Sequence, residues 1–418
     1  MSLKREIGLF GATMMGLGSI IGTGVFVSLG IAAGIAGAGV IVAIIAAAGV
    51  ATCNALSSAQ LAANHPVSGG TYEYGYRYLR PWLGFSAGWM FLCAKTASAA
   101  TAALGFAGYL LNATGQDPRW LAALAACTVA VLTAIVLAGI RLSSHFNIAI
   151  VSMTLVALAA FVVGGAPAVS ANHLQFTLEP LALLHATALM FVAYTGYGRI
   201  ATLGEEVREP RGTIPRAIII TLIVSALVYV SVAIVGVGAA GGETLAKAAI
   251  DKAAPLEVVS RHFPLRVHWI VAIGAITAML GVLLNLVLGL SRVLLAMGRR
   301  GDMPAATANA SVAVVVTGVA IAALAAIGSI KTNWSFSAFT VLVYYAITNL
   351  AALGLTGPER LYPRWIAWIG LVACLSLAFA VEWQVWLIGL ALIAGGLAWH
   401  AVSKKLVKRV QQTATGSE

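Results

Sequence analysis

Residues 16–26 read GLGSIIGTGVF and lie inside an apolar run that covers residues 9–36. A run of this length can cross a bilayer as a helix. Its glycines at positions 16, 18, 22 and 24 weaken a helix interior and permit unusual backbone angles. Inside lipid, an unwound backbone is tolerated only where protein or a cavity surrounds it. The stretch therefore predicts a transmembrane helix broken near its middle, with main-chain amides and carbonyls free to bind a small ligand.

The rest of the chain also has the composition of a membrane protein. Of its 418 residues, 60% are hydrophobic and 9% are charged, and the mean hydropathy of +0.94 is far above that of a soluble domain. At about 20 apolar residues per crossing, the sequence predicts an all-α polytopic fold with about twelve transmembrane helices. The expected spans cover residues 9–36, 37–62, 81–111, 119–140, 146–166, 181–203, 215–240, 267–297, 309–330, 333–356, 362–380 and 382–401.

A second glycine-rich interruption lies in the sixth expected span, where residues 191–199 read FVAYTGYGR. Two broken helices, five spans apart and of opposite sense, are what an inverted five-plus-five repeat predicts. The alternative is that the glycines only allow close helix packing. We expect one membrane domain, residues 1–418, with repeat one at about 9–166 and repeat two at about 181–356. Two extra helices at about 362–401 and a cytoplasmic tail, 402–418, would follow.

The positive charge is distributed asymmetrically about the expected spans. The net charge is +11, and 18 of the 25 Lys and Arg residues fall on one side of this topology against 6 on the other. The positive-inside rule then places both termini in the cytoplasm and argues against a nucleic-acid partner. The four cysteines all lie in apolar spans without metal-binding spacing, so we expect neither a metal nor another cofactor.

Four motifs carry a resemblance to a known family: GTGVF at residues 22–26, FVAYTG at 191–196, EEVREPRGTIPRA at 205–217, and a loop ending in MGRRGDMP at 297–304. In this order they resemble the amino acid–polyamine–organocation superfamily of permeases, which have the leucine-transporter fold. The resemblance implies a secondary active permease that moves amino acids across the plasma (inner) membrane, here a bacterial one, by alternating access. Lipid and the amino acid are its expected partners, and the sequence indicates no oligomeric state.

The resemblance also implies where an amino acid would bind. A half-helix that begins after a break presents free amides and a positive dipole end to a carboxylate. Carbonyls at the end of the other half-helix accept from the ammonium. The residues implied by the resemblance are Ile20, Gly22, Thr23 and Gly24 in the first break, and Val192, Ala193, Tyr194, Thr195 and Gly196 in the second. Tyr197, Tyr345 and Asn285 are further candidates for lining the site or gating it.

No acidic residue lies in the middle of an expected span. A cationic substrate side chain would need a buried carboxylate partner, so the sequence favours a neutral amino acid. A proton relay through a buried Asp or Glu is absent for the same reason.

Lys95 is the one charge inside an expected span. It lies about 14 residues from either end, roughly 20 Å at 1.5 Å per residue, which is too far for a lysine to reach water. Many relatives carry a lysine in the fifth helix in place of a sodium ion, and the aligned residue here is Thr154. Lys95 therefore supplies the coupling charge from another helix, binds the substrate, or is structural. Coupling to H+, coupling to Na+ and obligatory exchange stay open.

Other classes of protein fit less well. An enzyme would need a convergent set of catalytic side chains at membrane depth, and the spans show none. A channel would show a filter loop or a ring of charges. A membrane sensor would usually carry a soluble output domain. We therefore expect a transporter and not an enzyme, with a channel or sensor as the alternative.

Overall fold

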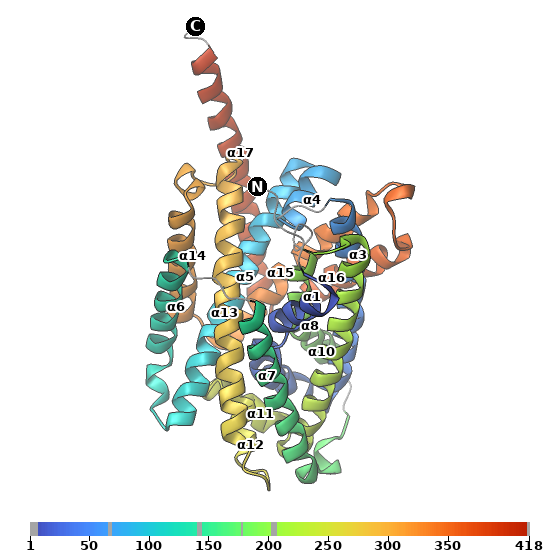
Figure 1. The fold of residues 1–418 in the computed structure, drawn as a ribbon, viewed down its shortest axis with the longest axis vertical. Coiled ribbons are helices and arrows are strands. Elements are labelled where there is room, and N and C mark those ends of the chain that lie inside the picture. The colour runs from blue at the N-terminus through green and yellow to red at the C-terminus, as the bar shows by residue number, and fades with distance from the viewer. Residues whose placement is uncertain (1–6, 66–68, 140–143, 177–178, 202–206, 416–418) are drawn as a thin grey trace.

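The computed structural model describes residues 7–65, 69–139, 144–176, 179–201 and 207–415. Regular structure in these ranges is helical, apart from a single parallel bridge between Ile7 and Val207. Figure 1 shows a bundle of long helices around short central segments. The predicted all-α polytopic fold is therefore confirmed. Glu205 and Glu206 of the third motif lie outside the described residues.

Both predicted breaks are present. The first broken helix consists of α1 (Leu9–Ile20), a π-helical turn η1 (Gly24–Ser28) and α2 (Leu29–Ala36), with Ile21 extended between them at φ −81° and ψ 99°. The second consists of α8 (Pro180–Tyr194), a 3-10 turn η6 (Thr195–Tyr197) and α9 (Gly198–Ala201). Glycine stands at both breaks, as the sequence pattern requires.

The remaining helices are η2 (Gly37–Gly39), α3 (Val40–Asn64), α4 (Thr71–Tyr78), α5 (Pro81–Thr114), η3 (Pro118–Trp120), α6 (Leu121–Leu137), α7 (Ser144–Gly165), η4 (Ala166–Ala168), η5 (Ala171–His173), α10 (Pro210–Ala240), α11 (Gly242–Asp251), α12 (Pro255–Ser260), α13 (His268–Arg299), η7 (Ala305–Ala308), α14 (Ala310–Ile327), α15 (Ile330–Leu353), η8 (Gly357–Glu359), α16 (Arg364–Ala378) and α17 (Trp383–Thr415). The long helices overlap the expected spans, whereas α4, α11 and α12 lie between them. The last helix continues past residue 401, where the tail was expected to begin.

Ten helical stretches in the described ranges are long and apolar enough to cross a membrane. One of them, Leu9–Asn64, contains both the first broken helix and α3, and the 15-residue α16 is shorter than a full span. The count of about twelve spans stays a prediction.

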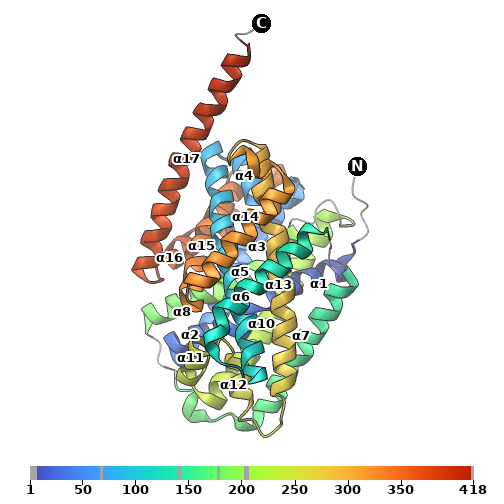
Figure 2. The same cartoon turned by 90° about the vertical axis from the view of Figure 1, so that its left-hand side faces the viewer.

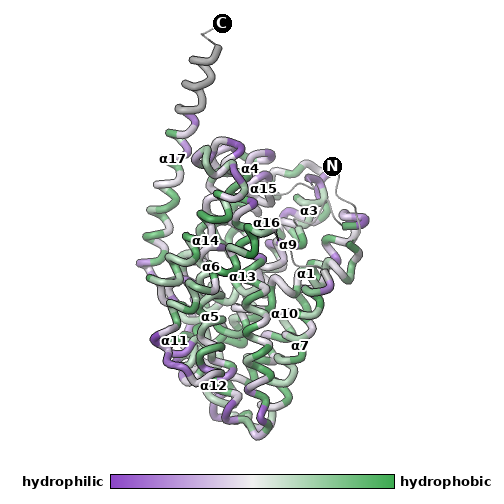
Figure 3. Tube along the Cα trace, turned by 60° about the vertical axis from the view of Figure 1, so that its left-hand side comes forward, coloured by the Kyte–Doolittle hydropathy of each residue, from purple (hydrophilic) through white to green (hydrophobic). Residues whose placement is uncertain are grey.

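Polarity divides the molecule along its long axis. Apolar segments fill the middle and polar ones gather at the two ends, with α4 at one end and α11 and α12 at the other (Figure 3). Large apolar side chains on α6, α7 and α14 are exposed, for example Val131, Val156 and Val319, as expected for helices that face lipid. The two broken helices are buried at the centre, and α17 projects beyond the body at the α4 end (Figure 2).

Candidate functional site

The two breaks lie directly against each other. A Cβ atom added at Gly24 would overlap the Cβ of Ala193, and one added at Gly196 would overlap the main-chain oxygen of Ser19. A Cβ at Gly22 would come within 2.7 Å of Val282 on α13. Glycine therefore does more than permit the local break, because only glycine lets the two unwound backbones approach this closely.

Tyr229 of α10 links the two breaks. Its hydroxyl donates to the carbonyl oxygen of Ile20 at 2.7 Å and lies 3.2 Å from the carbonyl oxygen of Ala193. The side chain is 1% exposed. Sequence reasoning missed Tyr229, because its position within an apolar span indicates burial but not the partner of its hydroxyl.

Three hydrogen bonds join at Thr195, two through its hydroxyl and one through its main-chain carbonyl. Lys95 Nζ of α5 donates to the Thr195 hydroxyl at 2.8 Å, and that hydroxyl donates to the Val192 carbonyl oxygen at 2.8 Å. The Tyr345 hydroxyl of α15 donates to the Thr195 carbonyl oxygen at 3.2 Å. The Tyr197 ring lies 5.4 Å from that of Tyr345. Lys95, Tyr197 and Tyr345 are thus brought to the second break.

Most of the carbonyls expected to hold an ammonium already have an internal donor. Those of Ile20, Val192, Ala193 and Thr195 are engaged by Tyr229, Thr195 or Tyr345. Three other polar atoms at the breaks, Thr23 Oγ1 and the hydroxyls of Tyr194 and Tyr197, are buried without a hydrogen-bond partner among the described residues. An unpaired buried polar group costs about 1–3 kcal/mol, so these three hydroxyls are where a ligand group would be stabilised.

Thr154 and Asn285 are not joined to this cluster by a recorded hydrogen bond. The Thr154 hydroxyl donates within its own helix, to the Ile150 carbonyl oxygen at 2.8 Å. Its helix, α7, packs against α1, where Asn147 and Val151 lie over Gly18. Asn285 is half-buried on α13.

Lys95 is the basic side chain that donates to Thr195 at the second break. Within the described part of the chain, no carboxylate forms an ion pair with Lys95. No group of three or more His, Cys, Asp or Glu side chains that could hold a metal occurs among the described residues. Main-chain carbonyls, hydroxyls and one amine therefore make up the polar surface of the breaks.

A polytopic helical membrane protein with two broken helices meeting at its centre has the architecture of a small-molecule transporter. The chain belongs to the amino acid permease family: the model of that family, described as amino acid permease, matches residues 11–415. It is therefore a member of the amino acid–polyamine–organocation superfamily, as the motifs predicted.

Individual relatives agree with this assignment. The chain is 41% identical to an uncharacterized transporter of Mycobacterium tuberculosis (strain ATCC 25618 / H37Rv), over 99% of this chain and 94% of the relative. It is 28% identical to the branched-chain amino acid permease BcaP of Bacillus subtilis, covering 72% of this chain and 69% of BcaP. It is also 28% identical to cationic amino acid transporter 9, chloroplastic, of Arabidopsis thaliana, over 72% of this chain and 57% of that protein. The family points to a transporter of amino acids in a membrane, and not to an enzyme.

Proposed function

We propose that the protein is a secondary active transporter that moves neutral amino acids by alternating access. The observation that carries the proposal is the meeting of the two breaks, with main-chain acceptors on both and the partnerless hydroxyls of Thr23 and Tyr194 beside them. The asymmetric positive charge supports a topology with both termini in the cytoplasm, and the mycobacterial relative supports a bacterial plasma (inner) membrane location.

In this proposal the substrate ammonium binds at the first and second breaks together. An ammonium has three donors, whereas the Tyr229 hydroxyl has one proton for the carbonyls of Ile20 and Ala193. Binding would exchange a neutral hydrogen bond for charge-assisted ones, which are roughly twice as strong. The carboxylate would meet Thr23, Gly24 and the amides at the start of the outer half-helix.

The neutral preference rests on charge. The cation of Lys95 lies at the second break, and no carboxylate pairs with it in the described ranges. A cationic substrate side chain would meet repulsion there and no counter-charge. In competition assays, small or aliphatic neutral amino acids should inhibit uptake better than arginine or lysine, and stronger inhibition by arginine would contradict the neutral assignment.

For coupling we propose Lys95 as the ion-linked group, with H+ as the ion. Lys95 belongs to α5 and its partner Thr195 to the second break, so the 2.8 Å bond joins two helices that alternating access would move apart. Na+-coupled symport and amino acid exchange are the competing mechanisms. The repeats proposed at residues 9–166 and 181–356 are supported by the occurrence of one broken helix near the start of each.

Counterflow of labelled amino acids into proteoliposomes tests the whole proposal. Purified protein should exchange at least one neutral amino acid, and an imposed pH gradient, but not a Na+ gradient, should drive net uptake. Protein-free liposomes are the blank. Absence of counterflow for every amino acid, with correctly folded protein, would overturn the transporter assignment for this substrate class.

A further inference from the structure

A cavity of about 260 Å³ lies at the end of α5, away from the two breaks. Asn112, Gln116, Pro118, Leu121, Lys252 and Arg261 line it. The space is much larger than the roughly 30 Å³ that one water occupies. Its polar lining consists of an ammonium, a guanidinium and two side-chain amides, and each of these groups has N–H donors.

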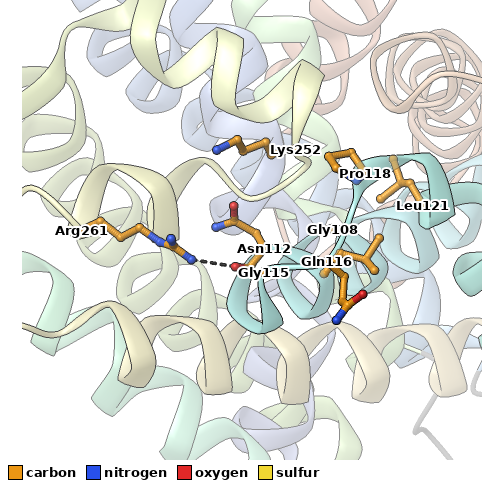
Figure 4. A pocket seen from close by; sticks show the side chains of 9 residues that line it. Gly108, Asn112, Gly115, Gln116, Pro118, Leu121, Lys252 and Arg261 are labelled. Atoms are coloured by element: carbon orange, nitrogen blue, oxygen red, sulfur yellow. Dashed lines mark hydrogen bonds between the residues drawn. The ribbon is translucent and has the colours of Figure 1, made fainter.

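The donors come from two sides of the cavity. Arg261 Nη2 donates to the Asn112 main-chain carbonyl at 2.7 Å and to Glu257 Oε1 at 2.8 Å. The guanidinium has five N–H donors, and its other nitrogens make no hydrogen bond to the described residues. Asn112 Nδ2 is buried without a hydrogen-bond partner in the described chain. Lys252 is exposed and forms no recorded ion pair with a described residue. Figure 4 shows the Asn112 side chain lying between those of Lys252 and Arg261.

The cavity joins two parts of the molecule. Asn112 and Gln116 belong to the end of α5 and the turn after it, whereas Lys252 and Arg261 flank α12. From α12, the Leu256 amide donates to the Tyr109 hydroxyl at 3.3 Å, and this hydroxyl donates to the Phe26 carbonyl at 2.7 Å. A ligand in the cavity would thus hold α12 against α5, next to the second half of the first broken helix.

Its depth fits the membrane–water boundary. Leu121 begins α6, a helix with largely exposed apolar residues, and Pro118 begins η3 just before it. Both α11 and α12 are among the polar segments at this end (Figure 3). Lys252, Arg261 and Asn112 Nδ2 are suited to a group with several acceptor oxygens.

We propose that this cavity binds a phosphate oxyanion, either the phosphodiester of an anionic lipid headgroup or free inorganic phosphate. The Lys252 ammonium supplies the positive charge not already neutralised by Glu257. Arg261 and the Asn112 amide fix the orientation of the oxyanion. The site is separate from the amino acid site and does not rest on the transport proposal.

The test uses the full chain in nanodiscs and follows the midpoint of thermal unfolding, because a ligand that binds the folded state raises it. One arm adds inorganic phosphate to phosphatidylcholine discs at constant ionic strength. The other replaces part of the phosphatidylcholine with phosphatidylglycerol. The Lys252→Gln variant removes the unpaired charge. Asn112→Leu removes the orphan amide but keeps the carbonyl that Arg261 binds. Lys247→Gln is the control, since it removes an exposed cation paired with Glu243 at 2.7 Å and outside the cavity.

The midpoint should rise in at least one arm for the wild-type protein and for Lys247→Gln. The apparent affinity should fall about tenfold in Lys252→Gln, as expected for the loss of a charge-assisted hydrogen bond, and by less in Asn112→Leu. A response to phosphatidylglycerol alone identifies a lipid headgroup, and a response to phosphate alone a free anion. No response in either arm overturns the site. An equal response in Lys252→Gln and Lys247→Gln also overturns it, because the effect would then be general charge screening.

Discussion

The two breaks and the buried cluster around Asp302 are both polar regions inside this molecule, but they are built from different interactions. At the breaks, hydroxyls donate to main-chain carbonyls, and Lys95 is the one basic side chain in these hydrogen bonds of the described residues. Around Asp302, a fully buried carboxylate is surrounded by two tyrosine hydroxyls, a histidine ring and a lysine ammonium.

The Asp302 cluster holds three separate segments together. The Tyr72 and Tyr76 hydroxyls of α4 each donate to Asp302 Oδ2 at 2.6 Å. His400 and Lys404 of α17 lie 3.4 Å and 3.2 Å from Oδ1. The carboxylate therefore joins α4 and the middle of α17 to the turn that follows α13.

A second ion pair reinforces this contact. Arg300 donates to both carboxylate oxygens of Glu73, at 2.9 Å and 2.7 Å. Its guanidinium also lies over the rings of Tyr72 and Tyr76, at 5.0 Å and 4.2 Å from their centroids.

The comparison indicates that hydrogen bonds at the breaks can be replaced by bonds to a substrate, whereas those at Asp302 are needed to keep a buried carboxylate stable. A neutral hydrogen bond at the breaks contributes about 0.5–1.5 kcal/mol, and a substrate group could replace it. Each tyrosine hydroxyl at Asp302 bonds a charged acceptor, and such a bond is worth about 1.5–3 kcal/mol. We therefore expect mutations at the breaks to affect transport, and mutations at the Asp302 cluster to affect stability.

Gly24→Leu should have the largest effect. The Cβ of the added side chain would overlap Ala193 and lie 3.3 Å from the Tyr229 hydroxyl, so the site would be filled and uptake abolished. Membrane insertion should be unchanged. Gly289→Leu, where a Cβ meets nothing within 4 Å, is the matched control. Uptake at the wild-type rate by Gly24→Leu would remove the first break from the substrate site.

Asp302→Asn should destabilise the protein by about 3 kcal/mol, because the Tyr72 and Tyr76 hydroxyls lose a charged acceptor, and a hydrogen bond to a charged group is worth about 1.5–3 kcal/mol. The substrate concentration for half-maximal uptake should not change. Thermal unfolding of purified protein measures the first quantity and proteoliposome uptake the second. Asp117→Asn, at an exposed ion pair with Arg119, is the control and should be close to neutral. A large change in substrate affinity would show that the Asp302 cluster affects transport as well as stability.

Lys95→Met should fold but lose either net uptake or its pH dependence, while exchange of internal for external substrate persists. The change keeps the length and apolar bulk and deletes the amine that donates to Thr195. Thr195→Val, which deletes the acceptor hydroxyl, should weaken the same response. An unchanged rate and pH profile in Lys95→Met would make the lysine structural and leave Na+ coupling or exchange as the mechanism.

The smallest expected effect is at Glu382, which lies just before α17. It pairs with His185 at 3.3 Å and with Lys331 at 3.1 Å. Burial raises the pKa of this carboxyl, but the hydrogen bonds from His185 and Lys331 outweigh it and hold the pKa below the ordinary value of 4.5. The carboxylate therefore contributes stability above pH 4.5 that is lost as the pH falls from 4.5 toward the depressed value.

A pH series of unfolding midpoints checks this contribution. The difference between the wild-type protein and Glu382→Gln should be present at pH 7 and shrink below about pH 4.5. A difference that grows on acidification would contradict the sign of the pKa shift. The result would also show whether this ion pair, like the Asp302 cluster, stabilises the folded protein.

Much of the fold followed from local signals. Apolar runs predicted the helices, and GTG at residues 22–24 and TGYG at 195–198 predicted both breaks. The motifs predicted the family. Hydropathy and glycine content act within a few residues of the chain, so they can be read without knowing what packs against a segment.

The contacts that fill the candidate site were not predictable in this way. Tyr229 lies 209 residues from Ile20, and Lys95 lies 100 residues from Thr195. Asp302, which sits in a polar loop motif, gave no sequence signal that it is buried. A hydroxyl or a carboxylate can pair with any donor or acceptor that the fold brings to it. The sequence alone thus established a broken-helix permease, and the packing of distant helices selected the partners of its polar groups, because those partners depend on proximity in space and not along the chain.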